Sequence, residues 1–138
     1  MTSGGTRLYR PRILIADDNQ PILERVKELL DPLYDVVGAV SSGPALVEHA
    51  IRLRPDLIVL DISMPGITGI EAARELKDSG SSAKVVFLTV HERVEFVQAC
   101  LAEGALGYVI KSRLQVDLPQ AILEALSGHR FISPPLSR

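Results

Sequence analysis

The sequence predicts an α/β fold in which helices cover both faces of a parallel sheet. Short aliphatic runs alternate along the chain with amphipathic segments of helical length, which is typical of repeated strand and helix units with right-handed crossovers. The runs are apolar at almost every position, so neither face of a strand is expected to meet water. The predicted strands are residues 12–16, 35–40, 57–60, 84–88 and 107–110.

The segments between the first strands carry helix signals. Apolar residues recur at helical spacing from Ile22 to Leu30, with charged residues on the opposite side, which indicates an amphipathic helix. Pro44 fits the first turn of a second helix. Thr68 and Glu71 have the spacing of a capping box, which predicts the start of a third helix.

Two further helices are expected in the second half of the chain. A fourth helix is predicted over about residues 92–103, and Gly104 ends it. A fifth is predicted to begin with Asp117 as its N-cap and to continue to about residue 127. With five parallel strands, the expected architecture is a flavodoxin-like three-layer sandwich with strand order 2-1-3-4-5, in which strands 1 and 3 are neighbours.

Length and composition favour one folded domain. The chain has 138 residues, of which 46% are hydrophobic and 23% charged, as in ordinary globular domains. Residues 1–10 are interpreted as a flexible leader, residues 11–128 as the domain, and residues 129–138 as a tail or the start of an interdomain linker containing a Pro-Pro spacer.

Charge and cysteine content narrow the class of function. The net charge is −2 and Lys and Arg are scattered, so this segment is not expected to bind DNA by itself. Cys100 is the single cysteine and is interpreted as a small buried hydrophobe. With no apolar segment of signal-peptide or membrane-spanning length, a cytoplasmic location and no membrane contact are expected.

Three carboxylates follow predicted strands. Asp17 and Asp18 close the first strand, and Asp61 closes the third. Because the carboxyl ends of neighbouring parallel strands meet at one edge of a sheet, these side chains are expected to converge. Like charges raise one another's pKa, so the cluster needs a cation or a substrate.

Two other polar residues follow the fourth and fifth predicted strands. Thr89 comes after the fourth and Lys111 after the fifth. Aspartates, a hydroxyl and an ammonium suit a phosphoryl group carried on a carboxylate, with Mg²⁺ held by hard oxygen ligands. Phosphoryl transfer needs little beyond positioning and electrostatic stabilisation, so a small site is sufficient.

Each of these residues also has an ordinary interpretation when it is taken alone. Asp17 and Asp18 could cap a helix, and Asp61 could cap a loop. Thr89 is at home at a strand end, and Lys111 could be an exposed charge. The functional interpretation depends on all of them occurring together at strand ends.

Taken together, the motifs resemble the receiver domain of two-component response regulators. The resemblance covers residues 12 to about 127. The residues that carry it are Asp17-Asp18, Asp61, Met64-Pro65-Gly66, Thr89 and Gly107-Tyr108-Val109-Ile110-Lys111.

The resemblance implies a role for each acidic residue. Asp61 would accept a phosphoryl group from the phosphohistidine of a sensor histidine kinase or a phosphotransfer protein. Mg²⁺ would be held directly by Asp18 and Asp61, through water by Asp17, and by the backbone carbonyl of Ser63. Apart from its own phosphorylation and dephosphorylation, the domain would catalyse nothing.

The resemblance also implies binding and switch residues. Lys111 and Thr89 would bind the phosphoryl oxygens, and Thr89 and Tyr108 would carry the change to a partner-facing surface; Tyr108 alone could equally be edge packing. Ser63 and His91 could tune the phosphoryl lifetime, although His91 could also be a plain surface residue. A homodimer is left open.

Features after Lys111 resemble a subfamily. Ser112 stands where most receivers have proline, and residues 128–134 resemble receivers of the NarL/LuxR-type (FixJ-like) group, in which a C-terminal module binds DNA. A regulatory part of a LuxR-type transcription regulator is therefore expected. The alternatives are a stand-alone response regulator that acts by protein contacts, a pseudo-receiver used only for binding and, more remotely, an aspartyl-phosphate hydrolase.

Overall fold

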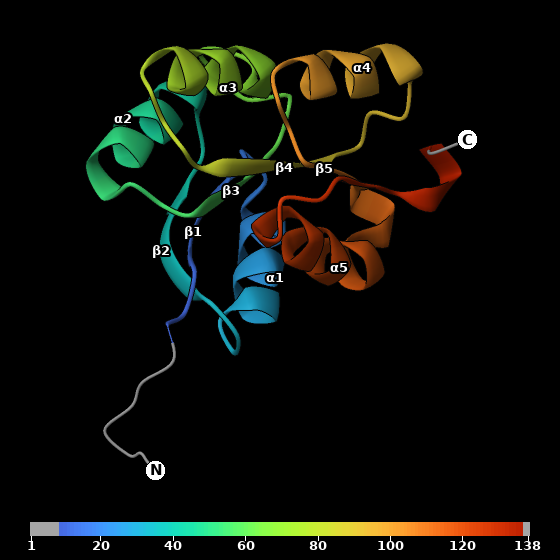
Figure 1. The fold of residues 1–138 in the computed structure, drawn as a ribbon, viewed down its shortest axis with the longest axis horizontal. Helices are drawn as coiled ribbons and strands as arrows, with labels where there is room; N and C mark the ends of the chain where they lie inside the picture. Colours follow the sequence, from blue (N-terminus) through green and yellow to red (C-terminus); the bar gives the residue numbers. More distant parts are fainter. Residues whose placement is uncertain (1–8, 137–138) are drawn as a thin grey trace.

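The computed structural model describes residues 9–136, which form a sheet between two layers of helices (Figure 1). Its strands all run parallel in the order β2-β1-β3-β4-β5-β6. The elements are β1 (Arg12–Ala16), α1 (Gln20–Leu30), β2 (Asp35–Val40), α2 (Gly43–Leu53), β3 (Leu57–Leu60), α3 (Gly69–Asp78), β4 (Lys84–Thr89), α4 (Val94–Ala102), β5 (Gly107–Ile110), a 3-10 turn η1 (Lys111–Arg113), α5 (Leu114–Leu126), β6 (Phe131–Ile132) and η2 (Pro134–Leu136).

The parallel sheet and the order of its first five strands confirm the prediction, but the expected count of five strands is wrong. The sheet has a sixth strand, β6, which pairs with β5 through Phe131 opposite Gly107 and Ile132 opposite Tyr108. The chain turns back toward the sheet at Gly128, whose φ of 82° suits glycine. Two residues are too short a run for an alternation pattern to reveal.

The division into leader, domain and tail stays a prediction. Residues 1–8 of the expected leader lie outside the described residues, and so do residues 137 and 138.

Helix starts were predicted with mixed success. The capping box of α3 is present: Thr68 Oγ1 accepts from the Glu71 N–H, and Glu71 accepts from the Thr68 N–H. The predicted N-cap of α5 is wrong, because η1 runs directly into a helix that begins at Leu114. Asp117 lies inside the first turn instead, where its carboxylate is engaged by Arg113.

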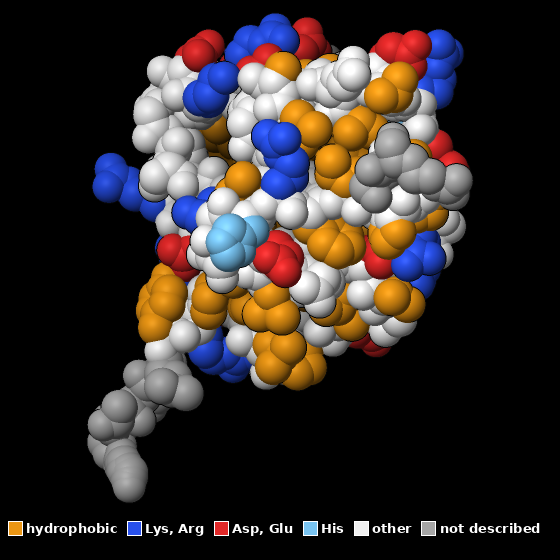
Figure 2. All heavy atoms as spheres, turned by 45° about the vertical axis from the view of Figure 1, so that its right-hand side comes forward, with side chains coloured by type: hydrophobic (Ala, Val, Ile, Leu, Met, Phe, Trp, Pro, Cys, Tyr) orange, Lys and Arg blue, Asp and Glu red, His pale blue; other side chains and the backbone are white. Residues whose placement is uncertain are grey.

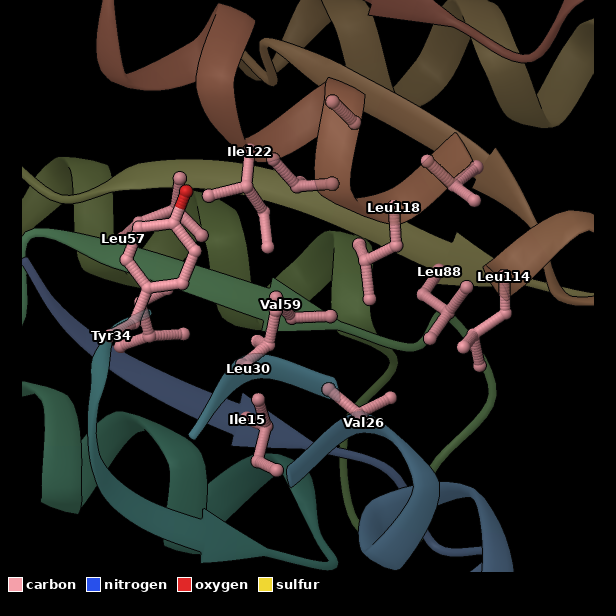
Figure 3. Close-up of a cluster of buried hydrophobic side chains, with 14 of the residues drawn as sticks. Ile15, Val26, Leu30, Tyr34, Leu57, Val59, Leu88, Leu114, Leu118 and Ile122 are labelled. Carbon is pink, nitrogen blue, oxygen red and sulfur yellow. The ribbon is translucent and has the colours of Figure 1, made fainter. Parts of the chain in front are cut away.

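The hydrophobic core is divided by the sheet into two layers. One layer lies between the sheet and helices α1 and α5; Figure 3 shows Ile15, Val59 and Leu88 of the strands facing Val26 of α1 and Leu118 of α5. The other lies beneath α2, α3 and α4, on the opposite side of the sheet in Figure 1. Both faces of β1, β3, β4 and β5 are therefore covered, as their largely apolar sequences predicted. The same prediction is wrong for β2, which lies at the edge of the sheet and has exposed residues.

Cys100 lies in the second layer with no exposed surface, and burial raises the pKa of its thiol to about 12. Its interpretation as a buried hydrophobe is confirmed. The helices among residues 9–136 are too short or too polar to cross a membrane. On the face drawn in Figure 2, acidic and basic side chains are interspersed among hydrophobic ones.

Candidate functional site

The pairing of β1 with β3 brings the acidic residues together. Ala16 is opposite Leu60 at the ends of these strands, and the N–H of Asp61 donates to the Ala16 carbonyl at 3.0 Å. Asp17 directly follows Ala16, and Asp61 directly follows Leu60, so both side chains lie at the same edge of the sheet. One carboxylate oxygen from each of Asp17, Asp18 and Asp61 lies within 4.8 Å of the others.

Lys111 completes the cluster from the end of β5. Its Nζ lies 2.8 Å from Asp17 Oδ2 and 3.2 Å from Asp61 Oδ2, and its side chain is only 13% exposed. Burial alone would lower the pKa of Lys111, but contact with Asp17 and the charges of Asp61 and Asp17 outweigh burial and raise it. The ammonium therefore stays charged between the two carboxylates.

The carboxylates are not fully compensated by this one cation. Asp17 is 3% exposed, and its burial, with a contribution from the Asp61 charge, raises its pKa against the contacts with Lys111 and Asn19. Asp17 Oδ2, although 2.8 Å from Lys111 Nζ, is the one buried side-chain atom of the described residues without a well-oriented hydrogen bond. A buried oxygen in this condition favours a further cationic partner.

The donor set fits a hard divalent cation. Mg²⁺ prefers carboxylate oxygens and keeps several waters, so it suits a site with one side open to solvent. Asp18 is exposed whereas Asp17 and Asp61 are buried, which leaves the cluster accessible from the Asp18 side. The acidic pocket is thus compatible with Mg²⁺, while a part for the Ser63 carbonyl stays a prediction.

Thr89 and Tyr108 are linked to each other through the backbone of His91. Thr89 is the last residue of β4 and is fully buried, and its Oγ1 accepts from the His91 N–H at 3.3 Å. The hydroxyl of Tyr108 donates to the His91 carbonyl at 2.7 Å. Tyr108 is also fully buried, and burial raises the pKa of its phenol, so it acts here as a neutral hydrogen-bond donor.

The His91 side chain reaches back to the loop after Asp61. Its Nε2 lies 2.8 Å from Ser63 Oγ, and its ring stacks on Phe96 of α4 with centroids 4.2 Å apart. The structure therefore brings Ser63 and His91 together, which sequence spacing alone could not show.

Gly69 contributes to the site in a way that the sequence did not reveal. A Cβ at this position would lie 1.9 Å from the backbone carbonyl oxygen of Asp61. The N–H of Gly69 also donates to the Ile62 carbonyl at 2.7 Å, so the start of α3 is held against the acidic loop. The only signal in the sequence is a glycine after Thr68, which could equally serve a turn.

The fold and this edge of its sheet together define a class of protein. The class is an α/β sandwich whose acidic pocket, containing one lysine, lies where strands β1 and β3 send their connections to opposite faces. The family model described as the response regulator receiver domain matches residues 13–123, and the chain belongs to this family.

Relatives and solved structures agree with this assignment. The chain is 37% identical over 126 residues to the transcriptional regulatory protein DesR of Bacillus subtilis, covering 90% of this chain and 62% of DesR. It is 36% identical over 129 residues to the response regulator GacA of Pseudomonas viridiflava, covering 92% of this chain and 60% of GacA. The chain thus spans less than two thirds of the length of these curated relatives.

A crystal structure of a LuxR-family two-component response regulator from Aurantimonas sp. SI85-9A1 superposes with a TM-score of 0.88. It is 31% identical in sequence, and the match covers 94% of both chains. These likenesses support the NarL/LuxR-type subfamily that the residues after Lys111 suggested.

Proposed function

We propose that Asp61 is the phosphoacceptor of this receiver domain. The observation that carries the proposal is the position of Asp61, buried at the end of β3 with Lys111 3.2 Å from its Oδ2 and two further aspartates beside it. A carboxylate oxygen of Asp61 would attack the phosphorus of a phosphohistidine on a sensor histidine kinase or phosphotransfer protein. The O–P bond forms as the N–P bond breaks, and the histidine nitrogen keeps the electron pair.

The surrounding residues have distinct parts in this reaction. Asp18, Asp61 and the Ser63 carbonyl would bind Mg²⁺ directly and Asp17 through water; the ion would offset negative charge on the transferred group. Lys111, which already contacts Asp61, would bind one phosphoryl oxygen. The buried hydroxyl of Thr89 would donate to another after rotating away from the His91 N–H.

Labelling by a small phosphodonor tests this proposal. With acetyl phosphate and Mg²⁺, intact mass measurement should show one phosphoryl group on the parent and none on Asp61→Asn. The matched control is Asp31→Asn, which alters a half-exposed carboxylate of the α1 terminus and should be labelled like the parent. Equal labelling of Asp61→Asn and the parent would remove the central claim.

The same experiment separates the receiver from the remote alternative of an aspartyl-phosphate hydrolase. A receiver takes up about one phosphoryl group per chain and then slowly loses it to water. Continuous turnover of a small phosphate ester would favour the hydrolase instead. A chain that takes up no phosphoryl group at all would favour the pseudo-receiver.

Phosphorylation would act by biasing a two-state element. Thr89 and Tyr108 meet at the His91 backbone, so rotation of Thr89 toward Asp61 would remove one of the two side-chain hydrogen bonds to this backbone, in the loop before α4. The surface of α4, β5 and α5 would change, and a partner or a second copy could sense it. Identical sedimentation with and without beryllofluoride would count against a change in oligomeric state.

Ser63 and His91 would tune the lifetime of the acyl phosphate. Their 2.8 Å contact joins the loop that follows Asp61 to the loop that follows Thr89, and an attacking water would approach near it. Ser63→Ala and His91→Ala should each change the rate of phosphate loss, whereas Ser82→Ala, an exposed serine before β4, should not. An unchanged lifetime in both site variants would contradict the hypothesis.

We further propose that the chain is the regulatory part of a transcription regulator. DesR is named a transcriptional regulatory protein and is longer than this chain, which is consistent with a further module in that relative. DNA binding would come only through such a C-terminal module. The alternative is a response regulator that acts alone through protein contacts; a reading frame that continues past Arg138 into a basic helical segment would decide against it.

A further inference from the structure

The segment after α5 is bound to the edge of the sheet by backbone hydrogen bonds. The Phe131 N–H donates to the Leu106 carbonyl at 2.8 Å, and the Ser133 N–H donates to the Tyr108 carbonyl at 2.9 Å. In Figure 1 this segment runs along β5 between α4 and α5. Residues 129–136, called here the C-terminal strap, therefore cover the strand that carries Tyr108 and leads into Lys111.

A buried polar cluster fixes the strap at Ser133. Its hydroxyl donates to Asp117 Oδ2 at 2.8 Å and accepts from the Ile110 N–H at 3.1 Å, and Ser133 has no exposed surface. Arg113 donates to both carboxylate oxygens of Asp117, at 2.6 and 3.1 Å. One serine hydroxyl thus connects the strap, β5 and α5.

The cluster encloses the turn that begins with Lys111. Ser133 holds the N–H of Ile110, the residue before Lys111, and Arg113 at the end of the turn is held by Asp117. Lys111 itself contacts Asp17 and Asp61. The turn η1 is therefore held on one side by the phosphoacceptor site and on the other by the strap.

We propose that the C-terminal strap is a latch whose docking competes with phosphorylation of Asp61. The inference rests on the proposed phosphoacceptor role. A phosphoryl group on Asp61 draws Lys111 Nζ away from its contacts with Asp17 and Asp61, and the turn from Lys111 to Arg113 shifts with it. The hydrogen bonds at Ser133 fit the present position of this turn, so the shift weakens them and releases the strap.

The strap is suited to this role because its strand is short and lies at the edge of the sheet. Its strand has two residues, and its apolar contacts come from partly buried side chains, with Phe131 on one core layer and Ile132 and Leu136 on the other. Segments of this kind open at a small fraction of the global unfolding free energy. Coupling is reciprocal, so a loosened strap must also favour the phosphorylated arrangement.

Amide hydrogen exchange on the parent chain tests the latch directly. With Mg²⁺ and beryllofluoride, the Phe131, Ser133 and Ile110 amides should exchange faster by roughly tenfold, within the usual range of coupling between sites. The Asp35 amide, which donates to the Pro11 carbonyl at the far edge of the sheet, is the control and should not change. Unchanged or slower exchange at Phe131 and Ser133 would overturn the latch.

A variant supplies the reciprocal measurement. Ser133→Ala removes the hydroxyl that connects Ile110 and Asp117, so acetyl phosphate should label Asp61 several-fold faster than in the parent, while Ser82→Ala should match the parent. Equal or slower labelling of Ser133→Ala than of the parent would contradict the latch.

The two proposals fail in different ways. A parent chain that cannot be labelled on Asp61 would overturn both the phosphoacceptor role and the latch. A parent that is labelled on Asp61, but whose strap amides keep their exchange rates, would overturn the latch alone.

Discussion

Two buried aspartates at the carboxyl end of the sheet differ in how their charge is compensated. Asp117 has every carboxylate oxygen engaged, by Arg113 and Ser133. Asp17 Oδ1 accepts from the Asn19 N–H, but Asp17 Oδ2 shares the Lys111 ammonium with Asp61 and makes no well-oriented hydrogen bond to it. Both residues are 3% exposed, so burial alone does not distinguish them.

The pKa shifts of the two carboxyls run in opposite directions. Burial opposes ionisation of Asp117, but the hydrogen bonds from Arg113 and Ser133 outweigh it and lower its pKa. For Asp17 burial prevails and its pKa is raised. The fully paired carboxylate is expected to stabilise the fold, whereas the environment of the other is compatible with a further cation.

The largest difference is expected in stability. Asp117→Asn should lower the free energy of unfolding by about 1–3 kcal/mol, because it removes the charge from a buried group that accepts several hydrogen bonds. The control is Asp31→Asn, which alters another i,i+4 ion pair. In that pair the side chains of Asp31 and Lys27 are 46% and 54% exposed. Urea unfolding should show a much smaller change for Asp31→Asn. Equal losses of unfolding free energy in the two variants would mean that burial of the Asp117 cluster adds nothing to stability.

Magnesium is expected to stabilise the protein by binding the cluster of Asp17, Asp18 and Asp61, and not the cluster around Asp117. At a free Mg²⁺ concentration ten times its Kd, the parent should gain about 1.4 kcal/mol of stability, measured by thermal or urea unfolding. Asp18→Ala, which removes the exposed ligand, should lose most of this gain, and Asp117→Asn should keep it. The same gain in Asp18→Ala as in the parent would show that the ion binds elsewhere.

This contrast also separates what the sequence could predict from what it could not. The convergence of Asp17, Asp18 and Asp61 was predictable because each follows a uniformly apolar strand and parallel strands end at one edge. The Lys111 contacts follow in the same way from the end of β5. Periodicity and strand order are sufficient for these positions.

The Asp117 cluster was beyond such reasoning. A sequence pattern with an aspartate near the start of a helix predicts an N-cap. Only the contacts of Asp117 with Arg113 and Ser133 show that it lies inside the first turn of α5. Strand β6 was missed because two residues carry no period, and the contact of Gly69 with the Asp61 backbone depends on how α3 packs. The Asp117 cluster, strand β6 and the Gly69 contact all depend on packing that exists only in the folded chain.

A smaller effect is expected from neutralising Asp17. Without Mg²⁺, Asp17→Asn should leave the free energy of unfolding unchanged or raise it by up to about 1 kcal/mol, because it relieves repulsion with Asp61 and leaves Lys111 paired to Asp61. The variant should bind Mg²⁺ more weakly than the parent, as titration calorimetry would show. A loss of stability as large as that of Asp117→Asn would erase the proposed distinction between the two carboxylates.

The smallest effect is a difference in pH dependence. Asp117 has a lowered pKa, so its unfolded state binds more protons; its stabilisation is complete above about pH 4 and is lost as the pH falls through the folded-state value. Asp17 has a raised pKa, so the folded state binds more protons, and the parent should lose stability as the pH rises from about 4 through that value. Subtracting the unfolding free energies of Asp117→Asn and Asp17→Asn from those of the parent, without Mg²⁺, should give curves of opposite slope. Two slopes of the same sign would show that the two carboxylates are compensated alike, in which case incomplete pairing could not be what sets the proposed phosphoacceptor site apart.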